Sequence, residues 1–151
     1  MPKELSDHLP SRFDLDDLRL PGFFSEIAVY LSLYTSGETQ GLGEEEYDVI
    51  NFAAEILGET SRDLRRNSIT KDGEIFFWKF YGQTKEEGEN PEKAKRLYAD
   101  RLNSISEQLF MVHHLPSEDI EKLISTCTAL SQATLQWWNS RHPTGFKRYA
   151  A

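Results

Sequence analysis

The feature that most constrains the fold is a pair of long helical patterns in the second half of the chain. In residues 91–113 and again in residues 117–142, apolar side chains recur every three to four positions, as on one face of a helix. Asn90 and Pro91 form a helix-start signal, and Pro116 ends the first helix because a residue that precedes proline avoids helical backbone. The connection is short. We therefore expect an antiparallel helical hairpin around which the rest of the chain packs.

Three further patterns precede this hairpin. Residues 23–36 carry apolar side chains at helical spacing, although residues 27–34 would also suit a buried strand. Residues 44–57 begin with three glutamates and are followed by Gly58, which favours a second helix with this glycine as its C-terminal cap. A short helix is then expected over residues 61–67.

The aromatic stretch in residues 69–82 is compatible with two structures. Asp72 and Gly73 form a dipeptide typical of a tight β-hairpin turn, and β-forming residues follow it. A helix over residues 75–81 is the alternative, because the strand before the turn would be short. The sequence therefore predicts an all-α fold, namely a four- to five-helix bundle with one short β-hairpin or aromatic insert near residues 69–82.

The chain divides into three regions. Residues 1–20 form an N-terminal arm, residues 21–142 a helical domain and residues 143–151 a C-terminal tail. The arm has leucines and prolines without a sustained period, so we expect it to pack on the helical domain, with docking on a partner as the alternative.

Charge is distributed unevenly. Residues 1–60 carry 13 acidic and 3 basic residues, whereas residues 61–101 carry 8 acidic and 10 basic residues, and the whole chain has a net charge of −8. An acidic first third is repelled by phosphate backbones and by anionic membranes. It is either a solvated acidic face or a docking surface for a basic partner.

The composition also predicts the compartment. No apolar run approaches the roughly 20 residues of a membrane span, and a single cysteine excludes an intrachain disulfide. We therefore expect a cytoplasmic protein that does not enter a membrane.

The sequence contains no recognisable catalytic, nucleotide-binding or metal-binding motif. The neighbours His113 and His114 diverge by about 100° on a helix and lack the i, i+4 spacing of helical zinc ligands. Cys127 lies on an apolar stripe, which is typical of a small buried hydrophobe. The aspartates at positions 14, 16 and 17 do not follow the pattern of a calcium loop. We expect no enzyme activity, no metal and no cofactor.

Aromatic residues indicate a surface for a protein partner. Adjacent tryptophans on a helix point about 100° apart, so at least one of residues 137–138 leaves the apolar stripe. Aromatic side chains are enriched at interface anchors. The alternative is that the C-terminal tail folds back over the second tryptophan. The predicted partner-binding residues are Trp78, Trp137, Trp138, Phe146 and Tyr149.

Basic residues interleaved with aromatics indicate a different surface, because such residues hold phosphates and stack bases. They occur in separate segments, so they form one stripe only if the fold brings them together. Otherwise they belong to exposed helix faces with ion pairs one turn apart. The predicted nucleic-acid-binding residues are Arg62, Arg65, Arg66, Lys93, Arg96, Arg101, Lys147 and Arg148.

The features favour a non-catalytic helical interaction protein, that is, an adaptor, a regulator or a subunit of a larger protein assembly. It would use its acidic N-terminal third and its aromatic-basic surface to bind a protein partner or further copies of itself. The alternative is a small helical subunit that binds RNA or DNA within a nucleoprotein complex. A small helical enzyme whose site is assembled from distant residues is the third interpretation.

Overall fold

The computed structural model describes residues 9–37, 42–82 and 90–142. This part of the chain is all-α, as predicted, and contains five α-helices. A single turn of 3-10 helix, η1, precedes the last of them. The helices are α2 (Arg19–Thr35), α3 (Glu44–Arg65), α4 (Lys71–Tyr81), α6 (Pro91–Phe110) and α7 (Ser117–Arg141), and η1 is Val112–His114. Residues 27–34 lie inside α2, so the strand alternative is wrong.

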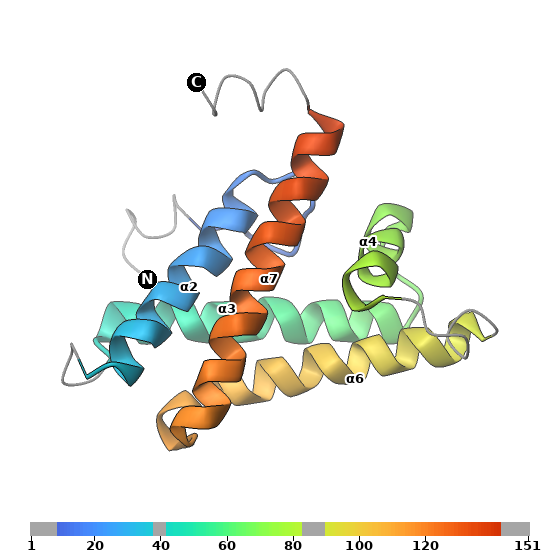
Figure 1. Ribbon diagram of the computed structural model, residues 1–151. Helices are drawn as coiled ribbons and strands as arrows, with labels where there is room; N and C mark the ends of the chain where they lie inside the picture. The colour runs from blue at the N-terminus through green and yellow to red at the C-terminus, as the bar shows by residue number, and fades with distance from the viewer. Residues whose placement is uncertain (1–8, 38–41, 83–89, 143–151) are drawn as a thin grey trace.

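The helices form two antiparallel pairs. Helix α2 packs along α7, and α3 packs along α6; the first pair runs across the second (Figure 1). One cluster of buried apolar side chains draws on all five helices of the described ranges. The two pairs are thus the two layers around a shared core.

The predicted packing of residues 91–113 against residues 117–142 is wrong. Both segments are helical, but α6 and α7 make few contacts with each other. Leu115 and Pro116 between them have extended backbone, with ψ of 143° and 156°, and this connection directs α7 away from the axis of α6. Each helix then buries its apolar stripe on a different partner.

The α3–α6 pair is held by small side chains. The Ser61 hydroxyl on α3 donates a 2.6 Å hydrogen bond to the Ala99 carbonyl oxygen, and the Ser106 hydroxyl on α6 donates one of 2.6 Å to the Ala54 carbonyl oxygen. Hydroxyl-to-backbone bonds of this length require the two helix backbones to approach closely. Small residues on both helices permit that approach.

Gly58 does not cap a helix. It is buried within α3, which continues to Arg65, so the separate helix predicted over residues 61–67 is the last part of α3. A Cβ atom at Gly58 would lie 3.2 Å from the Ser106 hydroxyl oxygen. The glycine therefore serves the close approach of α6, and packing outweighs its preference for a helix end.

The β-hairpin predicted near residues 69–82 is wrong, and the helical alternative is the structure. Residues 71–81 form α4, and no strand occurs in the described ranges. The Gly73 N–H group donates a 3.0 Å hydrogen bond to the Thr70 side-chain oxygen, which caps the helix. Gly73 thus lies in a capped first turn of a helix and not in a hairpin turn.

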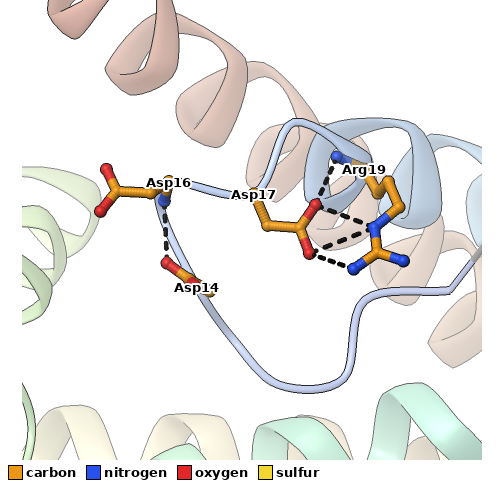
Figure 2. A network of polar contacts seen from close by, with 4 residues as sticks. All are labelled: Asp14, Asp16, Asp17 and Arg19. Atoms are coloured by element: carbon orange, nitrogen blue, oxygen red, sulfur yellow. Dashed lines mark hydrogen bonds and ion pairs between the residues drawn. The ribbon is translucent and has the colours of Figure 1, made fainter.

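The segment that precedes α2 packs on the core. Leu9 and Leu15 are buried. Figure 2 shows how the acids of this segment shape it: the Asp14 carboxylate accepts from the Asp16 N–H, and the Asp17 carboxylate accepts from the Arg19 side chain and N–H. The guanidinium of Arg19 lowers the pKa of Asp17. These acids set the local turn at the start of α2.

In the described ranges, no helix has both the length and the apolarity to cross a membrane.

Candidate functional site: a groove between α4 and α7

Helix α4 is fixed at its start by close contacts. Asp72 and Glu74 lie in its first turn, where carboxylates complement the positive end of the helix dipole. A Cβ atom at Gly73 would lie 2.9 Å from Ile69 Cγ1, so a larger residue would displace this side chain. The Thr70 cap and the absence of a side chain at Gly73 together set where α4 begins.

Aromatic side chains hold α4 in place from two sides. The Phe13 ring, on the segment before α2, lies 5.8 Å from the Phe76 ring and 5.3 Å from the Phe77 ring. On the other side, the Phe76 ring meets Trp137 of α7 edge-on at 5.9 Å. Aromatic pairs at such distances are stabilised beyond the area that they bury. Helix α4 is thus anchored near α7 by ring contacts.

Two hollows between α4 and α7 share Phe80, and α6 also lines the larger one. The smaller one has a volume of about 270 Å³ and the larger one about 430 Å³. We call them together the aromatic groove. The smaller hollow is lined by Phe76, Lys79, Phe80, Ala133, Gln136, Trp137 and Ser140. The larger hollow is lined by Phe80, Tyr81, Arg101, Ser104, Ile105, Ser125, Thr126 and Ala129.

The wall that α7 contributes consists mainly of small or polar side chains at helical spacing. Thr126, Ala129, Ala133 and Gln136 are three to four residues apart and lie on the groove. Apart from Trp137, the larger buried apolar side chains of α7 do not line the groove, and α7 packs chiefly on α2. The groove face of α7 is therefore left without a helix against it in the described part of the chain.

Cations lie over the rings that border the groove. Lys79 Nζ is 5.5 Å and Arg141 Cζ is 4.9 Å from the centre of the Trp137 ring. Arg101 Cζ is 5.1 Å from the centre of the Tyr81 ring. Arg141 also pairs with Asp72 at 3.3 Å. The groove is thus apolar along its floor and positive at both ends.

Two stacked tyrosines lie beside the larger hollow. The rings of Tyr81 and Tyr98 are 5.0 Å apart with an angle of 20° between their planes. The Tyr98 hydroxyl donates a 3.1 Å hydrogen bond to the Gly82 carbonyl oxygen. The Tyr81 hydroxyl is buried and has no hydrogen-bond partner in the described ranges, and burial raises its pKa. Tyr81 therefore remains a neutral phenol at physiological pH.

The residues predicted to bind a protein partner are not all in this groove. Trp137 lines it and is 8% exposed. Trp138 is half-buried and stacks on His142 at 4.3 Å, and Trp78 meets Tyr98 edge-on at 5.7 Å; neither lines the groove. The other two predicted residues, Phe146 and Tyr149, lie outside the described residues.

The fold does bring most of the predicted nucleic-acid residues to one end of the molecule. Because α3 and α6 are antiparallel, the end of α3 with Arg62, Arg65 and Arg66 lies beside the start of α6 with Lys93 and Arg96 (Figure 1).

Acidic residues are interleaved with this basic end. Arg65 pairs with Asp100, and Lys95 lies 3.3 Å from Glu74. Arg101 is on the same helix but borders the groove. Lys147 and Arg148 lie outside the described residues. The basic residues therefore converge without forming a patch of uniform charge.

Sequence reasoning missed Phe80, Lys79 and, apart from Trp137, the α7 residues that line the groove. On a strand, Phe76, Trp78 and Phe80 would share a face, whereas on the observed helix Phe76 pairs with Phe80, stacked at 5.9 Å. The alanines at 129 and 133 are one turn apart beside the apolar stripe of α7. That spacing was the available signal for a second, shallow face on this helix.

The histidine pair and the cysteine of the described ranges pack as structural side chains. The rings of His113 and His114 lie 4.0 Å apart and are tilted by 47° to each other, and the His113 ring meets Tyr47 edge-on. No cluster of three or more histidine, cysteine or acidic side chains suited to a metal ion occurs among the described residues. Burial raises the pKa of the Cys127 thiol to about 12. Cys127 is therefore a neutral thiol in the core.

Comparison of the chain with protein-family models, with curated proteins and with solved structures gives no match. A functional proposal therefore rests on the geometry of the aromatic groove and on the side chains that line it.

Proposed function

We propose that this protein is a non-catalytic interaction protein that holds a segment of a protein partner in the aromatic groove. The observation that carries the proposal is the pair of hollows, of about 270 and 430 Å³, that share Phe80 and lie beside α4 and α7. A shallow apolar channel with polar ends is the kind of surface into which an apolar helix face or an extended segment docks.

Desolvation of the groove favours this use. Phe80 and Ile105 are half-buried and line the hollows, and covering apolar surface contributes roughly 25 cal/mol per Å². The small side chains at residues 129 and 133 leave room for side chains of a partner. Phe76 and Trp137 are held by mutual ring contacts, so the floor requires little ordering when a partner binds.

Two glutamines on α7 allow a matched test. Gln136 lines the smaller hollow, whereas Gln132, one turn earlier and also exposed, does not line the groove. A photocrosslinking amino acid is placed at either position in the full chain, which is expressed in the cells of origin, and crosslinked proteins are identified by mass spectrometry. A partner that crosslinks at residue 136 and not at residue 132 supports the proposal.

Tryptophan substitutions at the same two positions provide a second test of the groove. Gln136→Trp fills the smaller hollow and should weaken capture of that partner at least tenfold, whereas Gln132→Trp should leave capture unchanged. A partner whose binding is unaffected by Gln136→Trp and lost on neutralisation of the acidic residues 44–46 would place the interaction on the acidic face and refute the groove.

A second candidate function, binding of RNA or DNA, is favoured by one observation. The basic residues at the end of α3 and the start of α6 lie beside each other, as a nucleic-acid surface requires. Against it stand the ion pair of Arg65 with Asp100 and the net charge of −8. Measurement of oligonucleotide binding at low and moderate salt tests this function, because several phosphate contacts produce a steep salt dependence.

A further inference from the structure

Arg101 has an environment that differs from that of the other arginines. Among the arginines of the described ranges it alone is half-buried, and the others are exposed. Its Cζ atom lies 5.1 Å from the centre of the Tyr81 ring and 5.9 Å from the centre of the Tyr98 ring. Stacking on two rings restricts the guanidinium group, so less conformational freedom is lost when it binds a ligand.

No carboxylate neutralises Arg101 within the described ranges. Arg65 pairs with Asp100 and Arg141 with Asp72, in a chain that has 25 acidic and 17 basic residues. A guanidinium group is best satisfied by a planar anion that accepts two of its N–H groups, such as a carboxylate. Within the described ranges, the Arg101 cation at the larger hollow therefore has no carboxylate as counter-charge.

The rest of the larger hollow suits an acidic side chain with an apolar neighbour. Exposed Ser104 and Ser125 line it and carry hydroxyl donors, while Phe80 and Ile105 offer apolar surface. The hollow is broad and open to solvent, as a site for a polypeptide segment is, rather than enclosed like most small-molecule sites.

We propose that the larger hollow is a recognition site for an aspartate or glutamate side chain of the protein partner, whose carboxylate binds the Arg101 guanidinium. An apolar side chain next to that acid packs on Phe80. This inference rests on the proposed function, because it specifies the chemistry of the segment that the groove holds. One half-buried arginine in a chain of net charge −8 suits a single carboxylate better than a polyanion.

The test begins with a display library of random 12-residue peptides selected on the purified full-length protein. Peptides from the selection should be enriched in aspartate or glutamate next to an aromatic or aliphatic residue. The best peptide and its Asp→Asn or Glu→Gln analogue are then measured by fluorescence anisotropy, and the amide analogue should bind at least tenfold more weakly.

Matched variants assign the effect to one residue. Arg101→Gln should weaken the acidic peptide at least tenfold and abolish its preference over the amide analogue, and Arg101→Lys should retain part of that preference. Arg96 lies on the same helix but is exposed and does not line the groove. Arg96→Gln should therefore change neither the affinity for the acidic peptide nor its preference over the amide analogue. Thermal unfolding of each variant verifies the fold, and Arg101→Lys keeps the test valid if Arg101→Gln destabilises the protein.

The failure of this inference is distinguishable from the failure of the proposed function. Selected peptides that compete at the groove, as judged by Gln136→Trp, but show no acidic preference overturn the carboxylate site and leave the groove as an interaction surface. Absence of any selected peptide that depends on the groove counts against both. An oligonucleotide that displaces the peptide and depends on Arg101 would overturn the assignment to an acidic polypeptide.

Discussion

Ser106 on α6 and Ala54 on α3 are joined by a 2.6 Å hydrogen bond from the serine hydroxyl to the alanine carbonyl oxygen. Ser106 is 4% exposed, so this hydroxyl is removed from water and depends on that acceptor. Ser61 forms the reciprocal bond from α3 to Ala99 of α6. The two bonds set how the antiparallel pair is aligned along its length.

Ser106→Ala should lower the free energy of unfolding by about 1 kcal/mol, the usual net value of one hydrogen bond. Ser104→Ala, at an exposed position on the same helix, should change it by less than about 0.5 kcal/mol. Urea unfolding followed by circular dichroism measures both. Equal effects at the two positions would contradict the importance of the interhelical bond.

The effect of Gly58→Ala on the free energy of unfolding should depend on whether Ser106 is present. Alanine is favoured over glycine inside a helix by about 1 kcal/mol, but its Cβ would lie 3.2 Å from the Ser106 hydroxyl oxygen, which offsets part of the gain. In the Ser106→Ala background that contact is relieved, so the substitution should be more stabilising there. A double-mutant cycle measures the difference. Additive effects would show that this contact is not tight.

Two tyrosines that stack on each other should respond in opposite directions to the loss of their hydroxyl groups. Tyr81→Phe removes a buried hydroxyl without a partner in the described ranges and should raise the free energy of unfolding by about 1 kcal/mol. Tyr98→Phe removes the 3.1 Å bond to Gly82 and should lower it by a similar amount. Chemical unfolding of the two variants tests the pair. Destabilisation by Tyr81→Phe would indicate that its hydroxyl is solvated or bonded.

Thr70→Ala should weaken α4 locally. The threonine oxygen accepts the Gly73 N–H at 3.0 Å, and loss of such a cap costs about 1 kcal/mol. Hydrogen exchange should accelerate in residues 71–81, and Thr70→Ser should restore protection because it keeps the oxygen. If exchange in α4 does not respond, the aromatic contacts alone hold this helix.

Cys127 should resist modification in the folded protein. It is fully buried, and its pKa is raised to about 12, so the reactive thiolate is scarce at pH 8. A disulfide-exchange reagent should react within seconds only after urea is added. Because the folded pKa exceeds the unfolded one, this thiol favours the folded state below about pH 9, and the contribution is lost as the pH rises toward 12. Rapid labelling of the native protein would refute its burial.

Local signals predicted much of the secondary structure. Asn90 with Pro91 marks the start of α6, and Pro116 marks the turn before α7, because proline restricts the backbone whatever surrounds it. Where local signals compete, they failed. Asp72 and Gly73 suit both a hairpin turn and a capped first helical turn, and the second prevailed because it lets Phe76 and Phe77 enter the core together.

The groove was less predictable than the helices. Trp137 and Arg101 were identified from residue type, but they were assigned to different surfaces, and Phe80 was not singled out. These three residues border one groove only because α4 lies near α7, and the spacing of apolar residues along the chain does not predict that arrangement. The acids that interleave with the basic residues, such as Asp100 beside Arg65, likewise become neighbours only when α3 and α6 pair.

The sequence by itself determined that the described chain is helical and which faces of the long helices are apolar, because the period of apolar residues and the prolines act within a few positions. Only the tertiary structure decided which helices pair. Apolar stripes attract any apolar surface, and the choice of α3 for α6 and of α2 for α7 depends on how closely particular side chains allow two backbones to approach. In the α3–α6 pair, this close approach involves Gly58, Ser61 and Ser106. The aromatic groove is the space that the pairing of the helices leaves beside α4 and α7.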